Sequence, residues 1–448
     1  MRDAIAAYHD LLTPETAAES QGMLDEQLRR HELVFGDRAL CTVLRPRFTS
    51  HENHRILQRR VRSLMRAFGK TYEAAIADRA FRSQFLLADW EESLIHHDPG
   101  FPNPSPTSRL DTFIIDETSE MKLTEYNAET PAGPAFTDAL SDAFVDLPVM
   151  RDFARRYDVR PIPARQGVLH VLLDAYRTWS GTRALPRIVI LDWNDVPTKQ
   201  EFVLFRDYFL SRGLDCFIGD PRDAELRDGR LFVGGRQVEL IYKRVLIAEL
   251  VERCGIDGPV VRAVRERAVC MVNAFRSKIL HKKASLAVLG DERNAGLFDA
   301  DERAAIGAHV PWTRTVTERY TEFEGRRIDL VPFIADQRER LVLKPNDDYG
   351  GTGIVLGWEV DDLTWDAAIR KATAEPFIVQ ERIPLPSESF PSWADGALVY
   401  ADRIVDTAPF VFHGAYADGC LTRVSTATLV NVTAGGGSTV PTFVVEKR

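Results

Sequence analysis

The sequence predicts an α+β protein that contains a smaller α/β part. Residues 1–95 repeat apolar side chains at three- and four-residue spacing, with few Gly or Pro, which is typical of helices. Residues 160–250 alternate β-branched runs with a helical segment, which predicts parallel strands joined by a crossover helix. Residues 256–448 mix short helical segments with several strand-like runs. These three observations define the fold class.

Composition and length favour a globular protein of two or three domains. The 448 residues are 45% hydrophobic and 27% charged, which is typical of folded chains. A net charge of -9 does not favour a nucleic-acid-binding or membrane-surface protein. We find no apolar run of about 18 residues and no apolar core of a signal peptide. The five scattered cysteines, without a CxxC motif, indicate reduced thiols and a cytoplasmic location.

The N-terminal region is predicted to be helical up to a break rich in Pro, Asn and Ser at 97–108. Thr13-Pro14 is typical of a helix start, because Pro is tolerated in the first turn. Helices are expected over 1–12, 16–33, 52–68, 71–79 and 82–95. The boundaries expected for the whole chain are 1–108, 109–159, 160–255 and 256–448.

A β-hairpin is predicted next, over residues 109–127. Two β-type runs flank a segment of turn composition at 116–120, and a helix is expected at 135–144. Arg109 and Asp111 open the first strand.

Glu125 and Asn127 end the second strand, so these two ends of the hairpin should lie side by side. The carboxylate and amide oxygens of Asp111, Glu125 and Asn127 would then suit Mg²⁺. A solvated strand end is the alternative interpretation.

Residues 160–255 are predicted to form a compact α/β unit. The unit should hold helices at 167–176 and 199–212, strands at 187–191, 215–219 and 239–245, and a hairpin at 225–236. The first strand is followed by Asp192-Trp193-Asn194-Asp195 and not by a Gly-rich phosphate loop. We therefore expect a substrate domain and not a dinucleotide domain. Asp192, Asp195 and Asp220 could contact a cationic amine, although loop carboxylates are usually solvated.

The most informative stretch, 341–357, reads LVLKPNDDYGGTGIVLG and predicts strand, glycine-rich loop, strand. Glycines at 350, 351 and 353 permit positive φ, so backbone N–H groups could face an anion. Lys344 could add a point charge to a phosphate. The usual P-loop and the Rossmann fingerprint are excluded, because no helix follows the glycines. An ordinary hairpin turn fits this stretch equally well.

The remaining C-terminal segments predict further helices and strands. Helices are expected at 262–272, 273–289, 301–308 and 365–373, and strands at 396–404 and 410–415. Within 376–388 a strand is expected to run straight into a polar segment. The loop at 435–437 is expected to be flexible.

Five ordered pieces together resemble the ATP-grasp ligases, and specifically glutathionylspermidine synthase and its circularly permuted relatives. The pieces are R-x-D at 109–111, EYNAETPAG at 125–133, HKKA at 281–284, VLKP with the glycine loop at 342–353, and IVQERIPLP at 378–386. The segment LTRVS at 421–425 is similar to the terminal segment of the family. The resemblance implies a circularly permuted ATP-grasp fold with an inserted α/β, pre-ATP-grasp-like substrate domain and a helical N-terminal layer.

The resemblance also implies roles for single residues. Asp111, Glu125 and Asn127 match magnesium ligands, and Arg109 matches the arginine that stabilises the transferring phosphoryl group. Lys283 and Lys344 match the lysines that hold the ATP phosphates, with Lys278 and Lys282 as alternatives to Lys283. The adenine would contact Gln380, Glu381 and Ile383, and the ribose Glu388. A mobile flap over the phosphates would comprise Asn346, Tyr349, Gly350, Gly351, Thr352 and Gly353, and would become ordered when nucleotide binds.

The implied activity is ATP-dependent ligation of a small carboxylate, such as an amino acid or peptide, to an amine. ATP and one or two Mg²⁺ ions would be required, and an acyl phosphate would be the intermediate. No nucleic acid or membrane partner is expected. Two other functions stay open, namely a nucleotide-binding protein without ligase turnover and a kinase that stops at a phosphorylated metabolite.

Overall fold

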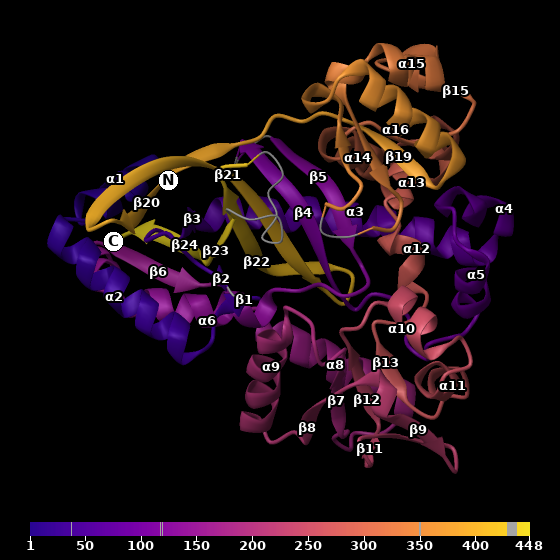
Figure 1. The fold of residues 1–448 in the computed structure, drawn as a ribbon, viewed down its shortest axis with the longest axis horizontal. Coiled ribbons are helices and arrows are strands. Elements are labelled where there is room, and N and C mark those ends of the chain that lie inside the picture. The colour runs from indigo at the N-terminus through magenta and orange to yellow at the C-terminus, as the bar shows by residue number, and fades with distance from the viewer. Residues whose placement is uncertain (37, 117, 119, 349–350, 428–436) are drawn as a thin grey trace.

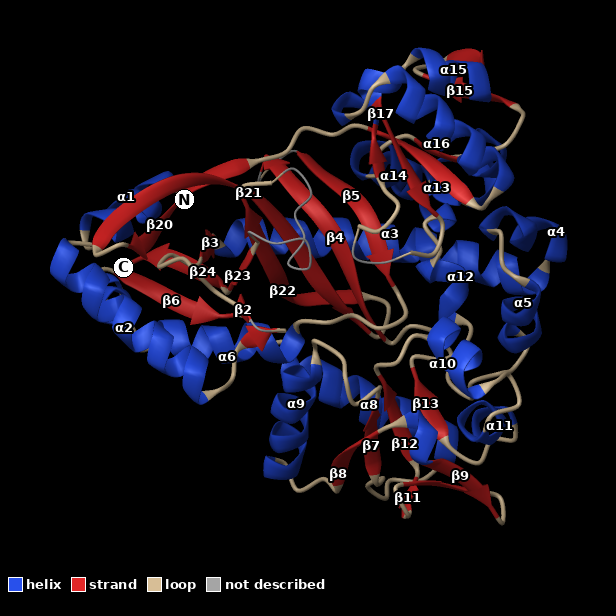
Figure 2. Ribbon diagram, in the orientation of Figure 1, coloured by secondary structure: helices blue, strands red, loops and turns tan. Residues whose placement is uncertain are grey.

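The computed structural model describes residues 1–36, 38–116, 118, 120–348, 351–427 and 437–448, which form three lobes (Figure 1). Helices cover the outer faces of the sheets in each lobe (Figure 2). Among the described helices, none is long and apolar enough to cross a bilayer. The predicted flexible loop at 435–437 lies outside the described residues except for its last glycine.

A large antiparallel sheet joins segments from both halves of the chain (Figure 1). Its described strands follow the order β23-β22-β21-β4-β5, with β20 paired to β21. These strands are β4 (Thr107–Asp116), β5 (Glu120–Asn127), β20 (Ser387–Ala394), β21 (Ala397–Phe412), β22 (Tyr416–Ser425) and β23 (Ser438–Val440). The predicted hairpin at 109–127 is confirmed. The two strands expected at 396–404 and 410–415 are one strand, because an irregularity after Pro409 accommodates the proline.

Helix α3 (His51–Ala77) covers one face of this sheet and also packs on α14 (Ala300–His309). The break expected at 69–70 does not occur, because buried Leu64, Phe68 and Ala75 continue one apolar face through it. The helix expected at 82–95 is wrong. It is divided into α4 (Arg79–Arg82), a 3₁₀ turn (Ser83–Phe85) and α5 (Asp89–Ile95), because Leu86 adopts φ 55.

The first helices pack at the far end of the same lobe, beside the last strand of the chain. Helices α1 (Arg2–Asp10) and α2 (Pro14–Arg30) share a core with α6 (Pro134–Val145) and α7 (Pro148–Phe153). A sheet of β3 (Arg47–Thr49), β24 (Thr442–Lys447) and β6 (Tyr157–Pro161) borders this core, with β24 in the middle. The short hairpin of β1 (Val34–Phe35) and β2 (Arg38–Ala39) follows α2. The N-terminal helices therefore do not form one separate layer.

The lobe formed by 165–272 contains a parallel sheet of order β13-β12-β7-β8. Its strands are β7 (Ile188–Leu191), β8 (Cys216–Gly219), β12 (Leu240–Lys243) and β13 (Cys270–Val272), and its helices are α8 (Arg165–Ser180), α9 (Lys199–Ser211), α10 (Ile247–Cys254) and α11 (Pro259–Arg265). A second sheet holds β9 (Ala224–Arg227), β10 (Arg230–Val233) and β11 (Arg236–Val238). The predicted crossover and the hairpin are confirmed. The helix expected at 262–272 is wrong at its end, because 270–272 forms a buried strand. A short apolar run in the sequence does not distinguish a buried strand from a helix.

The third lobe holds the glycine-rich stretch. Its main sheet has the order β14-β19-β17-β18, formed by β14 (Thr313–Thr315), β17 (Leu341–Pro345), β18 (Val355–Leu356) and β19 (Phe377–Glu381). The other elements are β15 (Tyr320–Phe323), β16 (Arg326–Asp329), α12 (Ser277–His281), α13 (Ala284–Gly290), α15 (Leu330–Asp336) and α16 (Asp362–Ala374). Val342 lies opposite Leu356 in antiparallel register, which confirms the predicted strand, loop and strand.

Candidate active site

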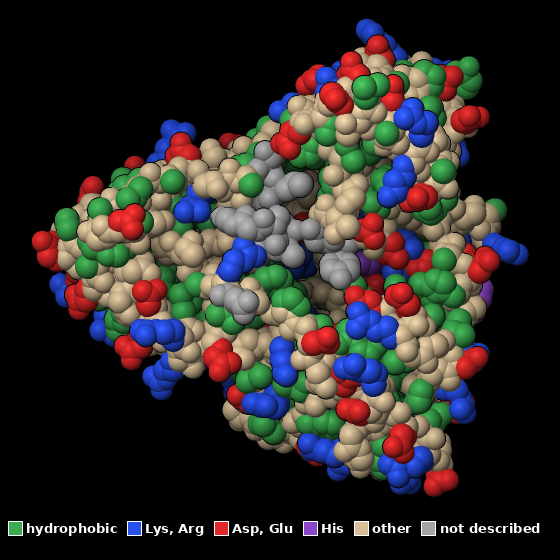
Figure 3. Space-filling view, viewed as in Figure 1, with side chains coloured by type: hydrophobic (Ala, Val, Ile, Leu, Met, Phe, Trp, Pro, Cys, Tyr) green, Lys and Arg blue, Asp and Glu red, His purple; other side chains and the backbone are tan. Residues whose placement is uncertain are grey.

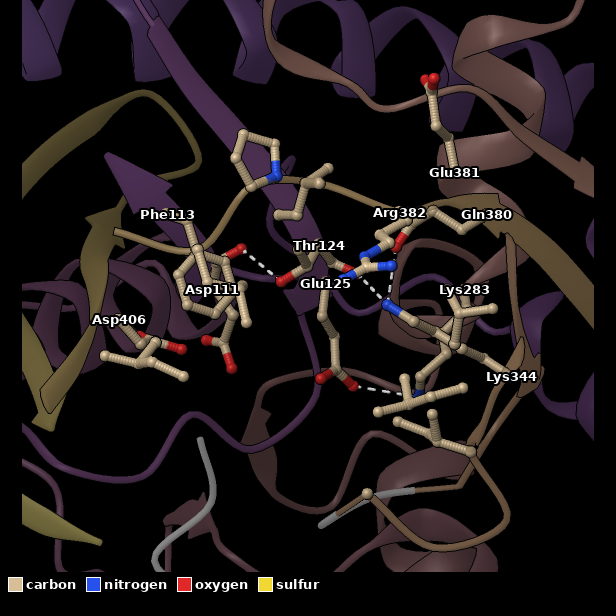
Figure 4. A pocket seen from close by; sticks show the side chains of 18 of the residues that line it. Asp111, Phe113, Thr124, Glu125, Lys283, Lys344, Gln380, Glu381, Arg382 and Asp406 are labelled. Atoms are coloured by element: carbon tan, nitrogen blue, oxygen red, sulfur yellow. Dashed lines mark hydrogen bonds and ion pairs between the residues drawn. The ribbon is translucent and has the colours of Figure 1, made fainter. Parts of the chain in front are cut away.

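A cavity of about 730 Å³ lies between the large antiparallel sheet and the lobe of β14–β19. Residues from β4 and β5 form one wall, β17 and β19 form another, and the connection at 382–385 passes between them (Figure 4). The cavity brings together most of the residues selected from the sequence, namely Arg109, Asp111, Glu125, Asn127, Lys283, Lys344, Gly351, Gln380, Glu381 and Ile383. The clustering of these distant residues is the main structural feature of the site.

Several selected residues do not line the cavity. Asn346 is buried, and its side chain accepts from the Ala284 N–H at 2.8 Å and donates to the Phe85 carbonyl at 2.9 Å. Its role in this structure is to fasten the base of the glycine loop. Thr352 and Gly353 are also absent from the lining. Tyr349 and Gly350 lie outside the described residues, so the ordering of the loop on nucleotide binding stays a prediction.

Glu388 corrects the expectation of a ribose-binding carboxylate. The residue lies on β20, opposite Arg403 of β21, and this strand pair leads away from the cavity. Its carboxylate pairs with the buried Arg45 guanidinium at 2.7 Å. A counter-ion for a buried arginine is a structural role, because an unpaired buried charge is costly.

The end of the hairpin places the arginine and the oxygen ligands next to each other. Asp111 lies opposite Glu125, and Arg109 opposite Asn127, in the register of β4 and β5. Arg109 holds Asp111 in a fork, with Nε 2.7 Å from Oδ1 and Nη2 3.0 Å from Oδ2. Nη1 of Arg109 donates to the Ala132 carbonyl at 2.8 Å. The cavity therefore contains a preorganised arginine–carboxylate pair.

A second arginine and a second aspartate extend this group. Nη2 of Arg423, on β22, lies 2.8 Å from Asp111 Oδ2 and 2.5 Å from Asp406 Oδ2. Both residues line the cavity. Arg423 belongs to the LTRVS segment of the sequence, whereas Asp406 carries no signal, because one aspartate in a strand is usually a solvated residue.

The two buried aspartates differ in their pKa, because the arginines outweigh burial only at Asp111. Burial raises the pKa of Asp111, but Arg109 and Arg423 together outweigh burial and hold the pKa well below its usual range. Asp111 is therefore ionised at neutral pH. Burial raises the pKa of Asp406 to about 7, although Arg423 opposes the increase. A further cation close to Asp406 would therefore favour the ionised form of its carboxyl.

Two lysines occupy the opposite side of the cavity (Figure 4). Lys283 Nζ lies 3.1 Å from Glu125 Oε1 and lowers the pKa of that carboxyl against the effect of burial. Lys344 Nζ donates to Gln380 Oε1 at 2.6 Å. Burial lowers the pKa of Lys344 to about 8, so its ammonium lacks a full counter-ion in this state.

The two alternatives to Lys283 belong to a different group, which we call the Asp347 cluster and which comprises Glu91, Glu129, Lys243, Lys278, Lys282 and Asp347. Lys278 Nζ lies 2.7 Å, and Lys282 Nζ 2.9 Å, from Asp347 carboxylate oxygens. Neither lysine lines the cavity. The cluster instead fastens the glycine loop to α12, and Lys283 is the one of these three lysines that lines the cavity.

The predicted metal ligands fit Mg²⁺ by their chemistry. Asp111 and Glu125 offer carboxylate oxygens and Asn127 an amide oxygen, and all three residues line the cavity. Mg²⁺ takes one or two protein carboxylates and completes its shell with water and phosphate oxygens. Within the described ranges, His, Cys, Asp and Glu side chains do not gather in groups of three that could hold a metal ion. The predicted set of Asp111, Glu125 and Asn127 does not count as such a group, because it contains only two carboxylates and its third member is an amide.

The remaining wall of the cavity is apolar. It is formed mainly by Val342, Ile354, Leu356, Trp358, Ile383, Pro384 and Leu385. The guanidinium of Arg382 stacks over the Trp358 ring with its Cζ 4.3 Å from the centroid. Glu381 points away from the other labelled side chains in Figure 4. A planar heterocycle would fit between such apolar walls, with Gln380 as its polar neighbour.

Comparisons with known proteins begin with sequences. No protein-family model matches the chain. An uncharacterized protein of Mycobacterium tuberculosis is 26% identical over 350 residues, which cover 72% of this chain and 58% of that protein. A protein of Frankia casuarinae, provisionally named glutamate–cysteine ligase 2-2, is 26% identical over 268 residues, or 54% of this chain and 28% of that protein. The chain thus spans at most little more than half the length of these curated relatives.

A comparison with solved structures defines the fold. A glutathione synthetase-like effector from Globodera pallida, solved in its apo form, superposes with a TM-score of 0.62 and 12% sequence identity. The superposition covers 96% of this chain and 98% of the effector. The chain therefore has a glutathione synthetase-like fold. Because the sequence identity is low, the comparison concerns the fold alone.

Proposed function

We propose that the chain is an ATP-dependent carboxylate–amine ligase of the circularly permuted, glutathionylspermidine synthase-like ATP-grasp type. The observation that carries the proposal is the single cavity that holds Arg109, the Asp111–Glu125–Asn127 set, Lys283 and Lys344. Its volume of about 730 Å³ suits a ligand of nucleotide size. The glutathione synthetase-like fold also supports this class of enzyme.

In this proposal ATP lies with its base against the apolar wall and its phosphates between the two lysines. ATP carries about four negative charges, which Lys283 and Lys344 offset in part. Asp111, Glu125 and Asn127 would hold Mg²⁺, which neutralises phosphate charge and orients the phosphates when it is bound. The glycine loop at 346–353 would cover the phosphates and exclude water.

The chemistry then follows in two displacements. An oxygen of the donor carboxylate attacks the γ-phosphorus, the bond to the β,γ-bridging oxygen breaks, and ADP leaves. The amine nitrogen next attacks the acyl carbon, the carbon–oxygen bond to phosphate breaks, and inorganic phosphate leaves. Arg109 makes three hydrogen bonds of the five that a guanidinium can donate, so two N–H groups can meet the charge that develops on the phosphoryl group.

The same proposal gives roles to the larger segments. Residues 109–159 and 256–448 would form the ligase core, and 160–255 the substrate domain. Residues 1–108 would support the core through α3, which packs on β22 and α14.

The test measures ADP and acyl transfer together. The full chain is incubated with ATP, Mg²⁺, hydroxylamine and a panel of amino acids and short peptides as carboxylate donors. Equal amounts of ADP and hydroxamate are expected for the correct donor, because hydroxylamine traps an acyl phosphate. A Lys344→Met variant is the matched blank. ATP binding without ADP release would favour a nucleotide-binding protein, and ADP with a stable phosphorylated product but no hydroxamate would favour a kinase.

A further inference from the structure

We propose that Asp406 and Arg423 bind the ammonium and the carboxylate of an α-amino acid, which is the amine substrate of the ligase. This inference rests on the proposed function and specifies one of its two substrates. The two residues lie directly opposite each other on β21 and β22. Both line the cavity, where Arg423 contacts Asp111 and Asp406 lies on the same side as Asp111 (Figure 4).

Both side chains keep hydrogen-bonding capacity that the protein does not use. Asp406 is 3% exposed, and its Oδ1 has no hydrogen-bond partner among the described residues. The Nε group of Arg423 is buried and also lacks a partner within the described part of the chain. A buried polar atom without a partner is costly, and the cost is removed when a ligand supplies the missing group.

The charges at this end of the cavity select the ligand class. Asp111 and Glu125 belong to the metal set of the proposed function, and Lys283 and Lys344 to the phosphates. Asp406 is then the remaining carboxylate of the sheet end, beside the two arginines. A polyamine would meet one anion among several cations, and a simple carboxylate would leave Asp406 unpaired. An α-amino acid supplies one ammonium and one carboxylate a few bonds apart, which matches the cross-strand pair.

The surroundings of Asp406 agree with a cationic ligand. Burial raises the pKa of Asp406 to about 7, and an ammonium next to it would restore the ionised form. Ile404, two residues earlier on β21, and Phe113, two residues after Asp111 on β4, line the adjacent wall. These apolar groups could contact the side chain of the amino acid.

The bond-forming step is balanced in this arrangement. The amino nitrogen forms a bond to the acyl carbon, and the bond from that carbon to the phosphate oxygen breaks. Of the three ammonium protons, one stays on the amide nitrogen, one leaves on the phosphate, and one passes to solvent.

The first experiment compares nucleophiles with the full chain, ATP, Mg²⁺ and the donor identified by hydroxamate formation. The matched pairs are glycine with methylamine and alanine with ethylamine, and spermidine is added as a polyamine. The α-amino acids should have kcat/KM values about 10- to 100-fold above those of the matching amines, the effect of one buried charge-assisted hydrogen-bonded group. Equal use of amine and amino acid, or a preference for spermidine, would overturn the inference.

Variants then locate the effect. Asp406→Asn should lower the ratio of kcat/KM for glycine to that for hydroxylamine by about 10- to 100-fold, because hydroxylamine is uncharged at neutral pH. Asp138→Asn is the control, since Asp138 is also a buried carboxyl paired with an arginine, Arg165, but lies outside the cavity. Its ratio should equal that of the wild type.

Folding and the proposed function are tested separately. Thermal unfolding checks each variant, and if Asp406→Asn does not fold, Arg423→Lys replaces it with a conserved charge but without the planar fork. This variant should reduce the preference for glycine over methylamine. An unchanged preference in the folded variants would disprove the substrate inference alone. A wild-type chain that forms no hydroxamate with any donor would instead disprove the ligase proposal.

Discussion

Arg109 makes most of its possible hydrogen bonds within the protein, with two to Asp111 and one to the Ala132 carbonyl. This arrangement fixes the guanidinium before any ligand arrives, so little reorganisation is needed when charge develops on a phosphoryl group. The arginine is therefore expected to act in the transition state more than in ATP binding.

Replacement of Arg109 tests this role. Arg109→Ala should lower kcat for ADP release by on the order of 10²–10³, the usual effect of losing one electrostatic stabiliser, with a smaller change in the KM for ATP. Arg222→Ala is the control, because Arg222 makes the same fork to Asp220 but lies outside the cavity. Near-normal turnover in Arg109→Ala would remove this residue from the mechanism.

Lys344 gives a prediction about pH. Burial lowers its pKa from 10.5 to about 8, and bound phosphates favour the charged ammonium. Above about pH 8, ATP binding must therefore take up a proton, and the affinity should fall by up to about tenfold per pH unit. Below pH 8 this group contributes no pH dependence.

Calorimetric ATP titrations between pH 7 and pH 9.5 can measure the effect. Lys344→Arg should remove the slope, because an arginine stays charged throughout this range. The same slope in wild type and variant would assign the titration to another group. In the free protein the sign for stability is opposite: burial of the ammonium costs stability below about pH 8, and this cost disappears as the pH rises toward 10.5.

At the scale of elements, the glycine-rich loop depends on one unusual backbone conformation. Gly353 adopts φ +70, and a Cβ at this position would lie 2.7 Å from Cγ of Pro345, the last residue of β17. Both features restrict the position to glycine. The loop therefore leaves β17 and enters β18 along a path that other residues would disturb.

Gly353→Ala should weaken ATP binding by about tenfold, because left-handed backbone costs a non-glycine residue roughly 1–2 kcal/mol before the contact with Pro345 is relieved. Gly296→Ala is the control, because a Cβ there would meet no atom within 4 Å and its φ is not positive. Calorimetry gives the Kd, and an unchanged value in Gly353→Ala would contradict a phosphate-covering role for the loop.

Elements with a strong local pattern were predictable from the sequence, and elements defined by distant partners were not. The hairpin of β4 and β5 and the crossover from β7 to β8 follow from alternation and turn composition. Strand β24 was missed because its partners lie at 47–49 and 157–161, far from it in the sequence. The same holds for the candidate site. Sequence motifs pointed to Arg109 and Lys344, whereas Asp406 could be selected only after the structure placed it opposite Arg423.

At the scale of the whole molecule, a buried ion pair of the α/β lobe is hydrogen-bonded to the segment that follows the β4–β5 hairpin. Arg244, just after β12, lies 3.0 Å from the Glu201 carboxylate and donates to the Pro131 carbonyl at 2.6 Å. Glu201 also accepts from the N–H groups of Gly133 and Ala135. The charged side chains on the face shown in Figure 3 are of both signs and interspersed.

Loss of Arg244 should therefore destabilise the whole chain. Arg244→Met leaves the Glu201 carboxylate buried and unpaired, at a cost of roughly 3–5 kcal/mol in the free energy of unfolding. The double variant with Glu201→Gln should regain part of this loss, because the amide oxygen can still accept from Gly133. Denaturant unfolding measures both, with Arg206→Met as a surface control that should cost at most about 1 kcal/mol. Equal losses in the surface and buried variants would contradict this account.

The contact between Asp111 and Arg423 joins residues 312 positions apart, and it has a consequence for synthesis of the chain. When only the first half of the chain has been synthesised, the wall of the cavity formed by β4 and β5 exists without the opposite wall. Strand β4 must wait for β21, and the sheet can close only when residues 410–425 have emerged. An incomplete nascent chain would consequently lack the contact between Asp111 and Arg423, and the polar end of β4 and β5 would stay in water until β21 and β22 pair.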